Sequence, residues 1–197
     1  MKVIALVSGG KDSTFAIAEA IKQGHEVVAL AHLSSFNLSK CLLHDSSSSS
    51  PSSSPLHVPG TSHESDSWMY QSVGSELVPL LSICFEKPLF WLEPSEPFTI
   101  HQDEQDYLKS FGASAFVKSD GLLDADVVRL WRLLRAAKEH LSVNPSTTPQ
   151  ALVSGAILSN YQRTRVEVIC RALGWTSIAP LWEKSQLDVL DAMAAPS

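Results

Sequence analysis

The chain opens with KVIALVSGGKDS, residues 2–13, in which an apolar run leads into two glycines and then into helical spacing. The run Val3–Val7 predicts a buried strand. The glycines allow backbone N–H groups to approach an anion closely, and the free N–H groups of a helix start add positive potential. Ser8 and Ser13 add hydroxyl donors, and Lys11 adds a full charge. The stretch therefore predicts a strand, a phosphate-binding turn and a helix.

The order of residues in this turn separates it from two other phosphate-binding motifs. A Walker A loop needs Ser or Thr after its lysine, whereas Lys11 is followed by Asp12, and the stretch is not a GxGxxG motif. The sequence SGGKDS instead resembles the pyrophosphate loop of the N-type ATP pyrophosphatases, which adenylate a substrate and release pyrophosphate. The resemblance implies ATP as the ligand of Ser8, Gly9, Gly10, Lys11, Asp12 and Ser13. The alternative is an ordinary glycine turn of an α/β domain.

Length and composition favour a single globular domain over residues 1–197. Apolar residues make up 44% of the chain, and no run approaches the roughly 18 apolar residues of a membrane span. The three scattered cysteines include no CxxC pair and support neither a disulfide framework nor a zinc site, so a cytoplasmic location is expected. The net charge of −6 makes nucleic acid an unexpected partner.

Two further strands are predicted before the middle of the chain, at residues 25–33 and 87–93. The end of the first lies beside the ligand crevice if the sheet is doubly wound, which makes Ala31 and His32 candidates for binding the nucleotide. The alternative for His32 is a solvent-facing residue at a strand end. The helix after the first turn is expected to bury one face, made by Thr14, Ile17, Ala18 and Ile21.

Between the predicted strands at residues 25–33 and 87–93, the sequence first loses its periodic pattern. Residues 45–64, rich in Ser and Pro, are predicted to be a disordered insertion in a loop. A helix is then predicted with Asp66 or Ser67 at its start and an apolar stripe made by Met69, Val73, Leu77, Leu80, Leu81 and Cys84. Gly74 in its middle suggests close approach of a ligand or partner, or tight helix packing. Tyr70, Gln71 and Gly74 are candidate substrate-binding residues.

The second half of the chain begins with an acidic segment, residues 94–121, that is expected to be irregular. The helix after it should bury Val127, Leu130, Trp131 and Leu134. Asp124 and Asp126 at its start are interpreted as capping charges in preference to metal ligands.

The stretch ALVSGAILSNYQRTRVEVICRAL, residues 151–173, repeats the pattern of strand, small-residue turn and helix. Its turn, Ser154-Gly155-Ala156, is a second candidate nucleotide contact. Val166, Ile169, Cys170 and Leu173 form the buried face of the helix. Extended backwards by one turn, this face reaches Gln162 and Arg165, whose polar groups need partners and are expected to find them in the ligand crevice. Arg163 and Glu167 have the spacing of a weak surface pair.

Three blocks of the sequence together resemble the diphthine–ammonia ligase family: SGGKDS, DSWMYQSVG, and SGAILSNYQRTRVEVICRALG followed by PLW. The resemblance implies ATP-dependent amidation of diphthine on elongation factor 2, in which the carboxylate is adenylated, ammonia attacks, and AMP and pyrophosphate leave. Lys11, Asp12 and Ser13 are the candidate catalytic residues, because negative charge builds on the departing pyrophosphate. Mg²⁺ is expected with the triphosphate, with Asp12 as its ligand. No glutaminase nucleophile is visible, which favours free ammonia.

Two departures from the family pattern concern the substrate side. The family's Gly-Glu-Gly-Gly-Glu-Tyr-Glu-Thr motif is missing after the predicted helix Gln186–Met193, so the chain is expected to be truncated at its C-terminus. Asn160 also stands where the family tends to have aspartate. One alternative function is therefore a non-catalytic form that binds ATP or AMP. The other is a different adenylating enzyme with the same loop, such as a tRNA-modifying ligase.

The expected fold is a Rossmann-like α/β domain of the adenine nucleotide alpha hydrolase-like type, with a parallel sheet of about five strands and helices on both faces. The strand order follows from the resemblance.

Overall fold

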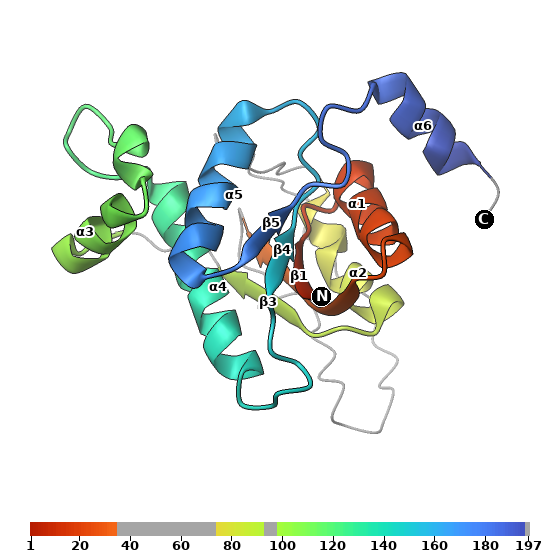
Figure 1. The fold of residues 1–197 in the computed structure, drawn as a ribbon, viewed down its shortest axis with the longest axis horizontal. Helices are drawn as coiled ribbons and strands as arrows, with labels where there is room; N and C mark the ends of the chain where they lie inside the picture. The colour runs from red at the N-terminus through yellow and green to blue at the C-terminus, as the bar shows by residue number, and fades with distance from the viewer. Residues whose placement is uncertain (35–73, 93–97, 196–197) are drawn as a thin grey trace.

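The computed structural model describes residues 1–34, 74–92 and 98–195, and its centre is one sheet of five parallel strands in the order β3-β2-β1-β4-β5 (Figure 1). The strands are β1 (Lys2–Leu6), β2 (Glu26–Leu33), β3 (Leu89–Leu92), β4 (Ala151–Val153) and β5 (Thr176–Ile178). Four of them lie where the apolar runs predicted strands, whereas β5 was not identified from the sequence. The parallel five-stranded sheet confirms the predicted fold class.

Helices cover both faces of this sheet. The α-helices are α1 (Lys11–Lys22), α2 (Val78–Phe85), α3 (Gln102–Ser110), α4 (Ala125–Leu141), α5 (Asn160–Leu173) and α6 (Gln186–Ala194). Two short 3₁₀ helices, η2 (Ser75–Leu77) and η3 (Ala113–Phe116), precede α2 and α4. None of the helices within the described part of the chain is long and apolar enough to span a membrane.

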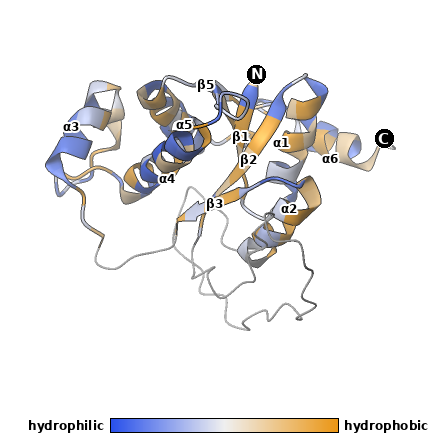
Figure 2. Ribbon diagram, turned by 90° about the horizontal axis from the view of Figure 1, so that it is seen from below, coloured by the Kyte–Doolittle hydropathy of each residue, from blue (hydrophilic) through white to orange (hydrophobic). Residues whose placement is uncertain are grey.

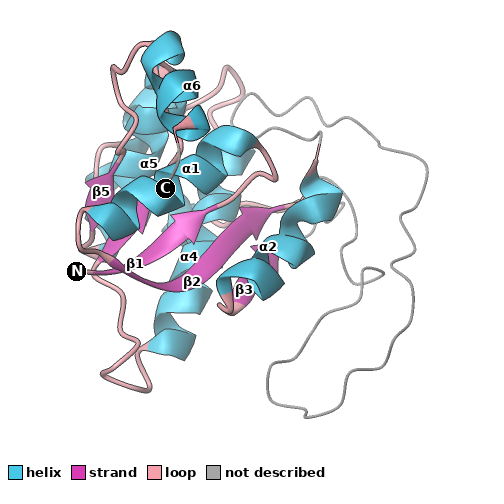
Figure 3. Cartoon of the chain, turned by 90° about the vertical axis from the view of Figure 1, so that its right-hand side faces the viewer, coloured by secondary structure: helices cyan, strands magenta, loops and turns pink. Residues whose placement is uncertain are grey.

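Alternation along β1 explains why helices are needed on both sides. Val3 and Ala5 pack in one cluster with Ile17 of α1, while Ile4 and Leu6 pack in the other with residues of α4 and α5. Successive strand side chains point to opposite faces, so a strand that is apolar throughout is stable only between two layers. Figure 2 shows the central strands in the hydrophobic colour between the two groups of helices, and Figure 3 shows β1 and β2 side by side with α4 behind them.

The inward face of α1 differs from the prediction. Its buried residues are Ser13, Ala16, Ile17 and Ala20. Of the four predicted residues only Ile17 is buried, and Ile21 is 49% exposed. The prediction followed apolar residues alone, whereas the buried face begins at a serine that is covered by the turn before the helix.

The helix predicted from residue 66 is also different. Its first part lies outside the described residues, and Gly74 is not inside a helix: it precedes η2 with a left-handed φ of +88°. Helix α2 then begins at Val78, which is buried, whereas Leu77 and Cys84 of the predicted stripe are exposed. The predicted insertion at residues 45–64 lies outside the described residues.

The segment expected to be irregular contains α3 and η3. Helix α3 lacks an apolar repeat, because its buried residues are one polar and one apolar side chain, Gln105 and Leu108. Its start is stabilised by Glu104, whose Oε2 accepts a hydrogen bond from the His101 N–H at 3.2 Å. A helix held by capping and with a single buried apolar side chain leaves little periodicity in the sequence.

The second half of the chain follows the prediction closely. Helix α4 buries the predicted residues, and Asp124 caps it by accepting a hydrogen bond from the Asp126 N–H at 3.1 Å. Helix α5 buries Val166, Ile169, Cys170 and Leu173, as predicted. Burial raises the pKa of the Cys170 thiol to about 12, so this cysteine serves packing and stays protonated.

Candidate functional site

A cleft of about 150 Å³ lies where β1 and β4 end. It is lined by the end of β1 (Leu6, Val7), by the turn and helix that follow (Ser8, Gly10, Asp12, Ser13), by the turn after β4 (Ser154, Gly155, Ala156) and by α5 (Gln162, Val166). The order of the strands reverses between β1 and β4, because β2 and β3 lie on one side and β5 on the other. In open α/β sheets, ligands bind outside the carboxyl ends of the strands at such a reversal.

The turn after β1 is closed by its own hydroxyl groups. The Ser13 Oγ donates to the Gly10 carbonyl at 2.9 Å and accepts from the Ser8 N–H at 3.3 Å. The Gly10 N–H donates in turn to the Ser8 Oγ at 3.4 Å. These bonds hold both serine side chains at the wall of the cleft.

The start of α1 adds positive potential to the same place. Gly10 is its N-cap and has no side chain to accept from the N–H groups of the first turn. Unpaired N–H groups at a helix start, together with the helix dipole, favour an anion. The cleft therefore combines backbone donors and hydroxyl donors around one small volume.

Glycines allow two other segments of backbone, at Gly74 and Gly155, to pack against this turn. Gly9 has a φ of +83°, and a Cβ atom there would lie 2.0 Å from the carbonyl oxygen of Gly74. A Cβ on Gly155 would lie 2.9 Å from the N and Cα atoms of Ser13. Only glycine allows these approaches. Gly74 thus packs against the turn and not inside a helix, and its own φ of +88° also favours glycine.

His32 and Ala31 hold the end of β1 instead of lining the cleft. The Nδ1 atom of His32 lies 2.8 Å from the Val7 carbonyl, which only accepts, so the proton is on Nδ1. The Ala31 carbonyl accepts from the Val7 N–H at 2.9 Å. Burial lowers the pKa of His32, and the imidazole is neutral. The alternative of a solvent-facing His32 is wrong, because its side chain is 1% exposed.

Lys11 and Asp12 pair with each other at the mouth of the cleft. The Lys11 Nζ lies 2.7 Å from the Asp12 Oδ1, and the lysine side chain is 63% exposed. Asp12 lines the cleft, whereas Lys11 is not among its lining residues. The described residues include no group of three or more His, Cys, Asp or Glu side chains that could hold a metal. Asp12 is a single carboxylate beside the cleft.

The two polar residues predicted on the inward side of α5, Gln162 and Arg165, contact different parts of the molecule. Gln162 lines the cleft. Arg165 instead donates from Nη2 to the Asp124 Oδ2 at 3.2 Å, with 11% of its side chain exposed. Arg163 pairs with Glu167 at 2.6 Å on the surface, as predicted. Tyr70 and Gln71 lie outside the described residues.

Sequence reasoning missed the apolar wall of the cleft and the environment of Arg165. Leu6, Val7 and Val166 line the cleft. Leu6 and Val7 belong to the first predicted strand, and the sequence predicted their burial but not their place in the cleft wall. Tyr161 donates to the Asp124 Oδ2 at 3.0 Å, beside Arg165. The polar neighbours Tyr161 and Arg165 on one helix were a signal, but their partner Asp124 is the N-cap of α4 and has no sequence relation to them.

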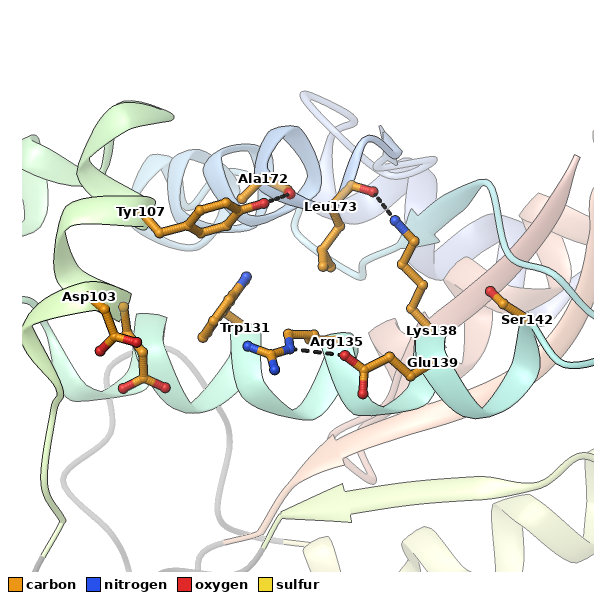
Figure 4. Close-up of a pocket in the computed structure, with 10 residues that line it drawn as sticks. Asp103, Tyr107, Trp131, Arg135, Lys138, Glu139, Ser142, Ala172 and Leu173 are labelled. Atoms are coloured by element: carbon orange, nitrogen blue, oxygen red, sulfur yellow. Dashed lines mark hydrogen bonds and ion pairs between the residues drawn. The ribbon is translucent and has the colours of Figure 1, made fainter.

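A larger hollow of about 680 Å³ lies away from the strand ends, between α3, α4 and the end of α5 (Figure 4). Tyr107 and Trp131 form its aromatic wall, with their ring centroids 5.7 Å apart. Its polar groups bind one another: the Lys138 Nζ donates to the Leu173 carbonyl at 2.7 Å, and the Tyr107 hydroxyl to the Ala172 carbonyl at 2.7 Å. We call this hollow the α3–α4 groove. None of the predicted site residues that the structure describes lines it.

Two comparisons with known proteins point to the same group of proteins. Residues 1–47 match the family described as the diphthamide synthase N-terminal domain. Nearly the whole chain, 98%, is similar to diphthine–ammonia ligases: 38% identical to that of Schizosaccharomyces pombe and 33% identical to that of Homo sapiens. The chain spans 25% of the length of the first and 57% of the second.

One solved structure, described as a predicted subunit of tRNA methyltransferase from Methanocaldococcus jannaschii, aligns with 98% of this chain and 74% of its own. It shares 13% identity with a TM-score of 0.39, which is too low to establish a common fold. The sequence relatives are the informative comparison. They confirm the resemblance found in the motifs: the chain is related to the diphthine–ammonia ligases over nearly its whole length.

Proposed function

We propose that this chain binds ATP in the cleft and catalyses the ATP-dependent amidation of diphthine to diphthamide on elongation factor 2. The observation that carries the proposal is the SGGKDS turn, closed on itself at the point where the strand order reverses. The relatives' names supply the reaction, and they favour it over a tRNA-modifying ligase.

The reaction runs in two displacement steps. A carboxylate oxygen of diphthine attacks the α-phosphorus of ATP, and pyrophosphate leaves with the electron pair of the broken P–O bond. Ammonia then attacks the carbonyl carbon of the acyl-adenylate, AMP leaves, and the nitrogen loses a proton to give the amide. Adenylation is needed because an alkyl carboxylate is a poor electrophile. Free ammonia is the proposed nitrogen source.

The cleft suits the phosphate end of the nucleotide. Its volume of about 150 Å³ is below the roughly 300–1,000 Å³ of pockets that hold a whole small-molecule ligand. We assign the pyrophosphate to the hydroxyls of Ser8 and Ser13 and to the N–H groups at the start of α1. Lys11 reaches the phosphates by leaving its exposed partner Asp12, because exposed ion pairs are weak. We assign the turn Ser154-Gly155-Ala156 to the end of the nucleotide away from the pyrophosphate.

The donor set fits Mg²⁺ bound with a nucleotide. Mg²⁺ is commonly held by one or two carboxylates together with substrate phosphates, so the Asp12 carboxylate at the cleft is a suitable ligand. Bound there, the ion would neutralise charge on the phosphate chain. Asp12 is freed for this role when Lys11 turns to the phosphates.

The remaining candidates divide into direct and indirect roles. Gln162 lines the cleft and is assigned to substrate binding. Ala31 and His32 act through the end of β1, which they hold by hydrogen bonds to Val7. Gly74 acts by supporting the turn at Gly9. Tyr70 and Gln71 stay proposed substrate contacts.

The test is pyrophosphate release by the purified chain with ATP, Mg²⁺, ammonium and diphthine-bearing elongation factor 2, alongside ATP binding by calorimetry. We expect ATP binding and pyrophosphate release that depends on the modified factor. Binding without turnover would limit the chain to a nucleotide-binding role. Absence of ATP binding would overturn the assignment of the SGGKDS turn.

A further inference from the structure

One buried carboxylate connects the starts of two helices at the ligand edge of the sheet. The Asp124 Oδ1 accepts from the Asp126 N–H and so caps α4. Its Oδ2 accepts from the Tyr161 hydroxyl at 3.0 Å and from the Arg165 Nη2 at 3.2 Å, both on α5. Only 9% of the Asp124 side chain is exposed, and the Lys118 Nζ lies 3.9 Å from Oδ1. We call these residues the Asp124 cluster.

Two aromatic rings and a backbone carbonyl also hold Arg165 in this cluster. Its guanidinium lies 3.3 Å from the centroid of the Tyr161 ring and 4.5 Å from that of Phe116. Its Nη1 also donates to the Tyr161 carbonyl at 3.1 Å. A buried guanidinium that stacks on aromatic rings and pairs with a carboxylate has little freedom to move. The cluster therefore fixes the first two turns of α5 relative to α4.

The same two turns form part of the cleft wall. Tyr161 is followed by Gln162, and Arg165 is followed by Val166, and both following residues line the cleft. A shift of α5 toward or away from α4 moves Gln162 with it, because the helix backbone is continuous through these positions. The Asp124 cluster and the cleft thus lie on neighbouring faces of one helix start.

We propose that Asp124 is a positioning residue of the cleft: its carboxylate holds the start of α5 and so places Gln162 beside the bound nucleotide. The proposal rests on the proposed function for the identity of the ligand. Asp124 itself does not line the cleft and is not assigned contact with ATP. Arg165, predicted from the sequence to face the ligand, acts with Asp124 instead.

The experiment compares two carboxylates that pair with arginines of the same helix. Asp124→Asn keeps a capping oxygen for α4, because Asn is as good an N-cap as Asp, but it removes the charge that holds Arg165. Glu167→Gln removes the exposed partner of Arg163 and is the matched control. We expect Asp124→Asn to weaken ATP binding about tenfold or more in calorimetry, and Glu167→Gln to change it by less than about twofold.

A double-mutant cycle separates positioning from general loss of structure. In a Gln162→Ala background, Asp124→Asn should have much less effect on ATP affinity than in the native chain, because the group that it positions is gone. An equal loss in both backgrounds, or no loss in either, overturns the proposal. Tyr161→Phe removes one hydrogen bond of the cluster and should give a smaller loss in the same direction.

A measurement without nucleotide separates this proposal from the proposed function. Hydrogen exchange of the backbone amides of residues 159–166 should be faster in Asp124→Asn than in the native chain, and unchanged in Glu167→Gln. If the native chain does not bind ATP but exchange responds as expected, the proposed function fails and the positioning of α5 stands. If exchange in Asp124→Asn is unchanged, the positioning role is wrong.

Discussion

The cleft and the α3–α4 groove differ in size and in chemistry. By size the groove is the stronger candidate for a ligand site, whereas by chemistry the cleft is. The groove has a volume of about 680 Å³ and the cleft about 150 Å³. In the groove, Lys138 and Tyr107 donate to carbonyls at the end of α5, so these polar groups already serve the fold. In the cleft, the N–H groups of a helix start face a small volume and have no capping side chain, although the Ser8 and Ser13 hydroxyls bond within the turn. The smaller hollow is the proposed site because of these N–H donors, whereas volume alone would have favoured the groove.

The strongest test of this comparison is Gly9→Ala. The new methyl would lie 2.0 Å from the Gly74 carbonyl oxygen, and a left-handed φ costs a non-glycine residue about 1–2 kcal/mol. The turn has to move, so we expect ATP binding to fall by about 100-fold or more in calorimetry.

Gly24→Ala is the matched control for this substitution. Gly24 has a φ of +80°, and a Cβ there meets nothing within 4 Å. Its substitution should lower the melting temperature slightly and leave ATP binding unchanged. Equal loss of binding in both variants would show that backbone strain, and not the contact with Gly74, governs the cleft.

Ser13→Ala should have the next largest effect. The Ser13 hydroxyl is buried at the cleft and links Ser8 to Gly10, so its removal takes away a placed donor. We expect turnover to fall by about 100- to 1,000-fold, the scale seen when one donor is removed from an oxyanion hole. Thr14→Ala removes a hydroxyl that donates to the same Gly10 carbonyl from outside the cleft lining, and it should retain most activity.

A change at the groove should affect stability and not binding. Glu104 accepts from the Arg132 Nε at 2.8 Å, and its side chain is 13% exposed. Glu104→Gln should lower the free energy of unfolding by about 1–3 kcal/mol at neutral pH and leave ATP affinity unchanged. Chemical denaturation and calorimetry check the two outcomes, and weakened ATP binding would contradict the distinction between the hollows.

The effect of Glu104→Gln should also depend on pH. The hydrogen bond from Arg132 lowers the pKa of Glu104 in the folded chain. A lowered folded pKa gives stability that is present above the ordinary carboxyl pKa and is lost as pH falls through the folded value. The difference between native and variant should therefore shrink in acid.

The smallest effect is expected from Glu139→Gln. This carboxylate also borders the groove, but it pairs with Arg135 where both side chains are more than half exposed. Exposed pairs contribute about 0–1 kcal/mol, so its stability should be close to that of the native chain. A larger loss than that of Glu104→Gln would reverse the expected order of the two pairs.

The parts of the site that the sequence predicted are those made by local chain. The SGGKDS turn is local because the hydrogen bonds that close it join one strand end to one helix start. Gly9 and Gly74 are far apart in the chain, so their contact leaves no local pattern in the sequence. The local apolar spacing therefore predicted Gly74 inside a helix. The partner of Arg165 was missed for the same reason, since Asp124 lies on another helix. Periodicity reports which face is buried but does not report what covers it.

The anchoring of Ser34 and Gly74 has a consequence for engineering and for evolution. The Ser34 N–H donates to the Leu92 carbonyl at 3.0 Å, and Gly74 packs against Gly9, so both flanks of residues 35–73 are tied to the body of the domain. For engineering, this means that a substitution that displaces Gly74 also acts on the turn, because the Gly74 carbonyl oxygen lies 2.0 Å from where a Cβ on Gly9 would be. For evolution, it means that Gly9 and Gly74 constrain each other, and replacement of either glycine has to be accommodated by the other.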